Sequence, residues 1–237
     1  MLSNQQIKYF KSLQQKKFRD QHEVFVAEGH KLIKDLLDSN LECLNLFKTD
    51  DEIIDHGELI SKKEMERITG LKSASNSYAV FKKRSNKVSD LSSSLVLLDG
   101  IQDPGNMGTI IRLADWFGYK HIICSKNTVD CYNPKVIQST MGSIRNVEII
   151  YLDLVDFVNQ HKGNYSFYGA FMEGANLKEI NRTEQIGIIL GNEGKGVSPE
   201  LGSLIDQKVS IPASAESKAE SLNVATAGAI FLHHFSA

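Results

Sequence analysis

The sequence is poor in the residues that mark secreted, metal-binding and membrane proteins. Its 3 cysteines are widely spaced and form no C-x-x-C pair, which argues against a disulfide scaffold or a zinc cluster and fits a reducing compartment. The 7 histidines show no ligand spacing, so we expect no metal. No run of roughly 18 apolar residues could span a membrane, and the N-terminus lacks a signal-peptide core. We therefore expect a soluble, cytoplasmic protein.

Neither sign of charge dominates, because 27 basic residues stand against 29 acidic ones. This balance excludes a histone-like basic chain but leaves room for a local basic patch. Glycine and proline are distributed unevenly. All 4 prolines follow residue 90, and only Gly29, Gly57 and Gly70 of the 17 glycines precede it. Together with the polar stretch 82–94, this shift in composition predicts two domains, residues 1–88 and 93–237.

The first half has the pattern of a small α/β unit. Apolar spacing predicts a helix over 4–19, then a strand over 23–27 and a helix over 28–37. Two basic clusters flank these elements. Such clusters are most often solvated surface, and a phosphate-binding face is the alternative. The clusters consist of Lys8, Lys11, Lys16, Lys17 and Arg19, and of Lys82, Lys83, Arg84 and Lys87.

The second half alternates strands and helices. We predict strands over 94–98, 121–123, 147–151, 166–170, 187–190 and 208–212. Helices are predicted from Asn106 to Phe117, after Asn133-Pro134, after Ser198-Pro199, and from Ser221 to about Phe235, with Asn106 and Ser221 as N-caps. This alternation predicts a mostly parallel sheet that is covered on both faces.

Three glycine- and amide-rich loops follow predicted strands, where α/β proteins bind their ligands. They span residues 99–112, 190–196 and 211–224. None has the G-x-G-x-x-G or G-x-x-x-x-G-K-[ST] spacing of nucleotide-binding loops, and no H-E-x-x-H or G-x-S-x-G motif is present. Dinucleotide, triphosphate, zinc-hydrolase and triad chemistry are therefore disfavoured.

The three loops, in this order, resemble the motifs of the SpoU (TrmH) branch of the SPOUT RNA methyltransferases. The matching strings are LLDGIQDPGNMGTIIRLADWFG, IILGNEGKGVSPEL and the pair IP…ESLNVATAGAI, with YNPKVIQSTMGSI between the first two. In the first half, KKFRDQHEVFVAEGHKLIKDLL is similar to the family's N-terminal substrate-binding domain. The resemblance implies a trefoil-knotted α/β methyltransferase domain with a parallel sheet, and a smaller α/β domain of ribosomal-protein-like fold that holds RNA.

The resemblance also implies a reaction and a site. The reaction is transfer of a methyl group from S-adenosylmethionine to a ribose 2′-hydroxyl of RNA, by a homodimer with no metal. Large-subunit ribosomal RNA is preferred over transfer RNA by analogy with the two-domain branch. The matching catalytic positions are Asn106, Arg112, Glu193, Ser221 and Asn223, and those of the cofactor pocket are Leu190, Gly191, Ile211, Leu222 and Asn223.

Each of these residues also has a structural explanation. Asn106, Ser221 and Asn223 are good N-terminal helix residues, Glu193 suits a solvated turn, and Arg112 could pair with Asp115. For Arg112 we favour a grip on phosphate and stabilisation of the developing alkoxide over a role as base, because a guanidinium with a pKa above about 12 stays protonated.

One segment departs from the family pattern. Between Ile211-Pro212 and Ser221 the chain carries the long, glycine-free string ASAESKAE, so no contact of residues 213–220 can be transferred. Two rival functions stay open. One is a catalytically silent RNA-binding or assembly factor of the same fold, and the other is a small-molecule α/β enzyme with a nucleotide cofactor.

Overall fold

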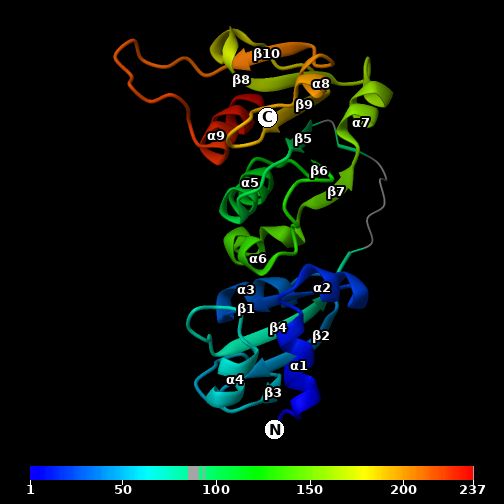
Figure 1. Cartoon of the computed structure of the whole chain (residues 1–237), viewed down its shortest axis with the longest axis vertical. Coiled ribbons are helices and arrows are strands. Elements are labelled where there is room, and N and C mark those ends of the chain that lie inside the picture. The colour runs from blue at the N-terminus through cyan, green and yellow to red at the C-terminus, as the bar shows by residue number, and fades with distance from the viewer. Residues whose placement is uncertain (85–90, 93, 237) are drawn as a thin grey trace. The chain divides into compact units, whose positions relative to one another are not determined.

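The computed structural model describes residues 1–84, 91–92 and 94–236, and internal contacts divide the chain into two compact units (Figure 1). The first unit contains Met1–Ser85 and Asp130–Arg145, and the second contains Asn86–Val129 and Asn146–Ala237. Among the described residues no helix is long and apolar enough to cross a membrane. Lys87, one member of the second basic cluster, lies outside the described residues.

The first unit is built on a four-stranded sheet in the order β1-β4-β2-β3. β4 is antiparallel to both β1 and β2, and β2 is parallel to β3. One face of the sheet packs apolar side chains of α1 and α4, among them Phe10 and Met65, which are almost fully buried. The elements from residues 1–84 are α1 (Asn4–Ser12), α2 (Lys16–His22), β1 (Val24–Glu28), α3 (His30–Leu37), β2 (Cys43–Lys48), β3 (Glu58–Leu59), α4 (Lys62–Ile68) and β4 (Ser77–Lys82).

The single helix predicted over residues 4–19 is wrong, because the chain breaks between α1 and α2. Leu13, just past α1, is fully buried, and the carbonyl oxygens of Leu13 and Gln14 accept hydrogen bonds from the Arg19 guanidinium at 3.0 and 2.8 Å. These side-chain bonds satisfy carbonyls that a continuous helix would use for itself. Arg19 is 1% exposed, so it cannot be part of a solvated basic face.

The opposite face of the first sheet is covered by α3 and by a segment from the middle of the chain. This segment contains α6 (Pro134–Thr140) and the 3-10 turn Ser143–Arg145, and α6 contacts β1. As predicted, Asn133 caps α6 through its side chain and Pro134 occupies the first turn. The Tyr132 ring stacks on Phe25 of β1 with 5.0 Å between ring centroids. A stretch between two strands of the second unit thus completes the core of the first.

The second unit contains a six-stranded sheet in the order β10-β8-β9-β5-β6-β7, in which every neighbouring pair is parallel. All six predicted strands are present, which confirms the parallel α/β fold. The elements are β5 (Ser94–Asp99), α5 (Pro104–Trp116), β6 (His121–Ser125), β7 (Glu148–Leu152), α7 (Leu154–His161), β8 (Ser166–Asn176), β9 (Ile186–Gly191), α8 (Pro199–Gly202), β10 (Gln207–Ser210) and α9 (Val224–Phe235).

Helices cover both faces of this sheet, as the sequence predicts. On one face, Leu95 and Leu97 of β5 join a cluster with residues of α7 and α8. On the other face α5 packs against α9, and the Tyr119 hydroxyl donates to the Leu232 carbonyl at 3.2 Å. Gly118 ends α5 with a φ of +80°, a conformation that favours glycine.

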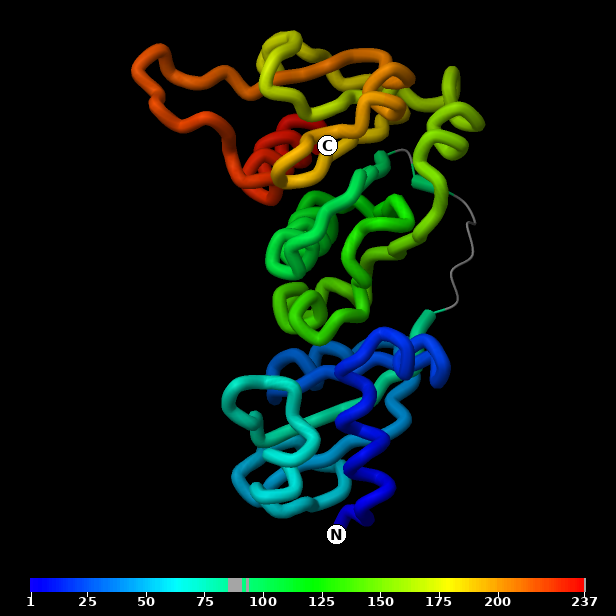
Figure 2. The backbone as a smooth tube through the Cα atoms, in the orientation of Figure 1, coloured from blue at the N-terminus to red at the C-terminus, as the bar shows by residue number. Residues whose placement is uncertain are grey.

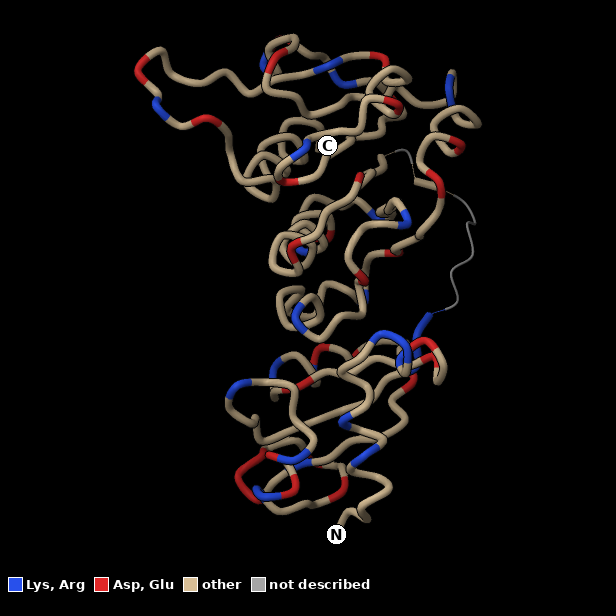
Figure 3. The backbone as a smooth tube through the Cα atoms, viewed as in Figure 1, with Lys and Arg blue, Asp and Glu red and all other residues tan. Residues whose placement is uncertain are grey.

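The segment between β10 and α9 is a long loop without helix or strand (Figure 2). Residues 212–223 are all exposed. Within residues 213–220 the hydrogen bonds are local: the backbone N–H groups of Glu216 and Ser217 bond to Ser214, and that of Ala219 bonds to the Ser217 hydroxyl. The segment carries charges of both signs (Figure 3) and corresponds to the string that departs from the family pattern.

The capping box of α4 generates a prediction on pH dependence. Hydrogen bonds from the backbone and side chain of Ser61 and from the backbone of Leu2 lower the pKa of Glu64 to about 2 from 4.5. Because the folded pKa is depressed, the carboxylate contributes stability fully above pH 4.5 and loses it as the pH falls toward 2. We expect Glu64→Ala to lower the free energy of unfolding at pH 7 by about 1 kcal/mol.

Denaturant titrations at pH 7 and pH 3 measure this effect. Glu64→Gln should keep most of the capping at pH 7 but lose the pH dependence between these values. Glu66, exposed on the same helix, is the control site. Equal unfolding curves for Glu64→Ala and Glu66→Ala at pH 7 would contradict the assignment.

Candidate functional site

The first candidate loop ends in the N-terminus of α5. The N-cap is Asp103, whose Oδ1 accepts from the Asn106 backbone at 2.8 Å, and Pro104 occupies the first turn. The prediction that Asn106 caps this helix is therefore wrong. Proline favours the first helical position, so the helix begins two residues earlier. Asn106 lies inside the first turn, where its side chain is free to bond elsewhere.

The third candidate loop ends at α9, and here too the cap differs from the prediction. Asn223, not Ser221, caps the helix, and its Oδ1 accepts from the backbones of Ala225 and Thr226 at 2.9 and 3.2 Å. Capping uses the oxygen of the amide, so the Nδ2 group points away from the helix. That group donates to Oδ1 of Asn106 at 2.9 Å.

The second candidate loop is a tight turn after β9. Asn192 and Gly196 exchange two backbone hydrogen bonds of 2.9 and 2.8 Å, and the Asn192 Oδ1 accepts from the backbones of Gly194 and Lys195 at 3.0 Å. Gly191 lies against this turn, and a Cβ atom there would come within 2.1 Å of the Gly196 carbonyl carbon. The turn projects Glu193 toward the first loop.

Glu193 joins the two loops. Its Oε1 accepts from Asn106 Nδ2 at 3.0 Å and from the Asp103 backbone at 3.1 Å, and its Oε2 accepts from the Gln102 backbone at 3.2 Å. Asn223, Asn106 and Glu193 therefore form one directed chain of hydrogen bonds, which runs from a helix cap to a carboxylate. Three of the five predicted catalytic residues, one from each loop, lie together.

These bonds hold Glu193 ionised. Partial burial by itself would raise the pKa of the carboxyl group, but the hydrogen bonds from Asn106 and from backbone N–H groups outweigh it and lower the pKa below 4.5. The site therefore presents a fixed anion and two oriented amides at the surface. Such groups can bind the hydroxyls and base edges of a polar ligand.

Arg112 and Ser221 do not join this cluster within the described part of the chain. Arg112 is exposed on α5, and no described residue forms an ion pair or hydrogen bond with it. The alternative pairing with Asp115 is wrong, because both oxygens of Asp115 accept from Asn146 Nδ2 instead. The Ser221 side chain is exposed in the loop before α9.

The predicted cofactor residues lie at the ends of β9 and β10 and just before α9. In the sheet, β8 lies between β9 and β10. Leu190 and Gly191 are buried at the end of β9, where Gly191 pairs with Asp99 of β5. Ile211 is half-buried after β10, and Leu222 is 49% exposed just before α9. Apolar side chains on a polar loop suit the adenosine part of a cofactor, which needs apolar contact on its faces and backbone groups at its edge.

Sequence patterns missed several residues that shape the site. Asp99 accepts from the Ser198 backbone at 2.7 Å, and Asn192 Nδ2 donates to the Gly100 carbonyl at 2.7 Å, which clamps the two loops together. Asp103, which caps α5, is not among the site residues predicted from the sequence. An Asp directly before Pro is the signal for an N-cap that could have identified it.

The basic clusters of the first unit are partly paired with carboxylates. Lys16 and Lys83 both pair with Asp20, at 2.5 and 2.6 Å, and Lys82 pairs with Glu42 at 3.3 Å. Lys8, Lys11 and Lys17 are exposed, and the described residues supply no ion pair for them. Among all residues that the structure describes, no group of three or more His, Cys, Asp or Glu could bind a metal ion.

The site thus consists of three loops at the strand ends of a parallel α/β unit, in a chain that also contains a smaller α/β unit. The profile of the SpoU rRNA Methylase family matches residues 93–233, and that of the MRM3-like substrate binding domain matches residues 4–92. The chain belongs to the SpoU rRNA methylase family, and its cofactor is S-adenosylmethionine.

Full-length relatives agree with this assignment. The chain is 31% identical to the 23S rRNA (guanosine(2553)-2′-O)-methyltransferase RlmP of Bacillus subtilis, over 98% of this chain and 96% of that protein. A structure assigned to the TrmH family of RNA methyltransferases, from Porphyromonas gingivalis, is 34% identical, with a TM-score of 0.89 and coverage of 100% and 98%. An AdoMet-bound rRNA methyltransferase from Sinorhizobium meliloti is 28% identical, with a TM-score of 0.85 and coverage of 99% and 95%.

The turn after β9 gives a prediction about two glycines. In Gly191→Ala the new methyl group meets the backbone of Gly196 and Val197 at 2.1 Å, so the turn must shift and carry Glu193 with it. We expect at least a tenfold weaker binding of S-adenosylmethionine and a lower unfolding midpoint. Calorimetric titration and thermal unfolding measure these quantities.

Gly194→Ala is the matched control, because a Cβ atom there has no neighbour closer than 3.8 Å and the substitution should leave both quantities unchanged. Wild-type affinity in Gly191→Ala would show that the close packing of this turn is not needed for the cofactor.

Proposed function

We propose that this protein transfers a methyl group from S-adenosylmethionine to a ribose 2′-hydroxyl of large-subunit ribosomal RNA. The observation that carries the proposal is the hydrogen-bonded chain of Asn223, Asn106 and Glu193, which joins all three loops at the strand ends. The full-length relative from Bacillus subtilis, named for this reaction on 23S rRNA, supports the substrate class.

The bound cofactor supplies an electrophilic methyl group on a sulfonium. The protein's part is to align the two reactants and to stabilise negative charge on the attacking 2′-oxygen. Leu190, Gly191, Ile211, Leu222 and Asn223 are our proposed cofactor contacts. The Asn106 and Glu193 side chains, held in one orientation by their mutual bond, are proposed to bind the target nucleotide through its hydroxyls or base edge, with Ser221 at the same edge.

Arg112 is proposed to act on the RNA directly. Its guanidinium is exposed and has no ion-pair partner among the described residues, so it is free to grip a phosphate next to the target ribose. From there its positive charge stabilises the developing alkoxide. A role as proton acceptor is not proposed, since a guanidinium stays protonated.

The remaining proposals concern assembly and substrate capture. We propose that residues 1–88 form the domain that holds the RNA, in keeping with the substrate-binding profile over residues 4–92, and that residues 93–237 form the methyltransferase domain. Within the two basic clusters, Lys8, Lys11 and Lys17 are exposed and have no ion pair among the described residues, and we propose that they contact RNA phosphates. We also propose a trefoil knot in the second domain, a homodimer in the cytoplasm, and a role in ribosomal RNA processing.

The proposed function is tested by transfer of labelled methyl from S-adenosylmethionine to total RNA from cells that lack this protein. Size fractionation, digestion and nucleoside analysis should locate a 2′-O-methyl mark in the large ribosomal RNA. The nucleotide that aligns with the one methylated by the Bacillus subtilis relative is the first to inspect. A mark confined to transfer RNA would contradict the substrate class, and cofactor binding without transfer to any fraction would favour a silent RNA-binding factor.

Arg112→Ala should lower the turnover number at least about 100-fold, because one charged group that stabilises the transition state is lost. Affinity for S-adenosylmethionine should stay within twofold of the wild type. Arg112→Lys keeps the charge but not the planar fork, so it should retain intermediate activity. Turnover assays and calorimetry check this, and wild-type turnover in Arg112→Ala would remove the residue from the mechanism.

A further inference from the structure

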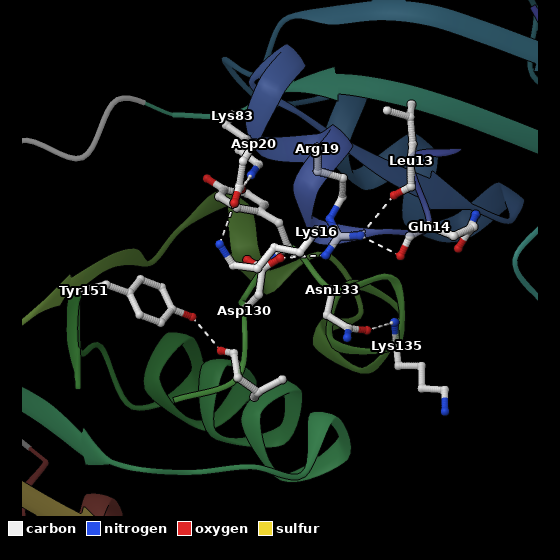
Figure 4. A network of polar contacts seen from close by, with 12 residues as sticks. Leu13, Gln14, Lys16, Arg19, Asp20, Lys83, Asp130, Asn133, Lys135 and Tyr151 are labelled. Atoms are coloured by element: carbon white, nitrogen blue, oxygen red, sulfur yellow. Dashed lines mark hydrogen bonds and ion pairs between the residues drawn. The ribbon is translucent and has the colours of Figure 1, made fainter. Parts of the chain in front are cut away.

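Arg19 is a buried cation with specific partners inside the first unit (Figure 4). Its side chain is 1% exposed, and its guanidinium donates to the carbonyls of Leu13 and Gln14 and to Oδ2 of Asp130 at 2.7 Å. Asp130 is itself only 10% exposed. A buried ion pair with this geometry is held in one arrangement, because either charge left alone would be buried without compensation.

Asp130 begins the segment 130–145, which docks on the first unit at several further points. The ring of Tyr132 lies under the Lys83 ammonium at 5.1 Å, in addition to its stacking on Phe25. The Gln138 side chain donates to the Glu28 carbonyl at 2.7 Å. Arg145, at the end of the segment, pairs with Asp35 at 3.6 Å. The whole segment is thus bound to the unit that carries the substrate-binding profile.

The residues directly before Asp130 bind the first active-site loop in the second unit. The Val129 backbone N–H donates to the Ile101 carbonyl at 2.8 Å, and the Thr128 hydroxyl donates to the Leu98 carbonyl at 3.0 Å. The Asn127 carbonyl accepts from the Gln102 side chain. The Tyr151 hydroxyl donates to the Val129 carbonyl at 2.6 Å (Figure 4).

That loop is the one that holds Glu193. The backbones of Gln102 and Asp103 donate to the Glu193 carboxylate, so the path of residues 98–103 decides where the carboxylate lies. A single peptide bond, between Val129 and Asp130, therefore separates residues bound to the substrate-binding unit from residues bound to the active-site loop.

We propose that Arg19 and Asp130 are positioning residues for methyl transfer. Their ion pair anchors the segment that follows Val129 within the first unit, and through the adjoining residues 127–129 it fixes the path of the active-site loop. The proposal rests on the proposed function. It assigns a role in catalysis to a buried pair in which neither residue touches substrate or cofactor.

The test uses the full-length protein with Arg19→Met, Asp130→Asn and the double variant Arg19→Met/Asp130→Leu. Each single variant leaves one charge buried without its partner and lowers stability. The apolar double variant should regain the part lost to the unpaired charge, but not the part lost with the hydrogen bonds to the Leu13 and Gln14 carbonyls. All three should show at least a tenfold loss in kcat per folded active site, with the Kd for S-adenosylmethionine and for RNA within twofold of the wild type. Active sites are counted by cofactor binding, so partial unfolding does not enter kcat.

Hydrogen exchange gives a readout that does not depend on turnover. The Val129 amide is bonded to Ile101 and the Gly100 amide to Ser125 at 2.8 Å, so both should exchange at least tenfold faster in the double variant. Amides in β8, which does not pair with β5, should exchange as in the wild type. If no RNA is methylated even by the wild-type protein, the proposed function fails while this measurement still tests the coupling.

Lys16→Met is the matched control. Lys16 lies on the same helix as Arg19 but makes an exposed ion pair with Asp20, and its loss should leave kcat and exchange unchanged. Wild-type kcat in the double variant would overturn the proposal and leave the pair with a purely structural role. Unchanged exchange at Gly100 and Val129 would overturn the path through residues 127–129.

Discussion

The parallel pairing of β5 with β9 is the constraint on which the site depends. The register runs from Ser94 opposite Ile186 to Asp99 opposite Gly191, so both strands end at the same level. The chain therefore enters the first and second loops side by side, although more than 90 residues separate them in sequence. The Asp99 carboxylate accepts a hydrogen bond from the Ser198 backbone, and the Asn192 side chain donates one to the Gly100 carbonyl, so each loop is bonded to the other. A slip of register would separate Asn106 from Glu193.

Helix caps give the site its direction. An asparagine side chain can present either an acceptor or a donor, and capping removes this freedom. Asn223 uses its oxygen to cap α9 and therefore offers its Nδ2 to Asn106, which in turn offers its own Nδ2 to Glu193. In α5 the cap is Asp103, which leaves the Asn106 side chain free for this role. Residues that look like ordinary helix starts thus combine structural and functional roles.

The division of the chain into units does not follow its linear order. Residues 130–145 lie between two strands of the second unit, yet they complete the core of the first. The apolar stacking of Tyr132 on Phe25 and the buried pair of Arg19 and Asp130 explain why the segment is held there. Two residues of the basic clusters take part in this packing: Arg19 is buried against Asp130, and the Lys83 ammonium lies over the Tyr132 ring. The exposed positive charge of the first unit is therefore smaller than its composition indicates.

The sequence by itself determined the parallel α/β fold, the six strands of the second unit, the cap of α6 and the three loops. Local signals suffice for these, because strand runs and Asn-Pro caps act over a few residues. Only the tertiary structure decided the break between α1 and α2, the caps at Asp103 and Asn223, and the burial of Arg19. The break depends on the burial of Leu13 and its bond to Arg19, the caps depend on competition between neighbouring candidates, and the burial of Arg19 depends on a partner far along the chain. Asp130, 111 residues beyond Arg19, is the plainest case, since no local pattern could have paired them.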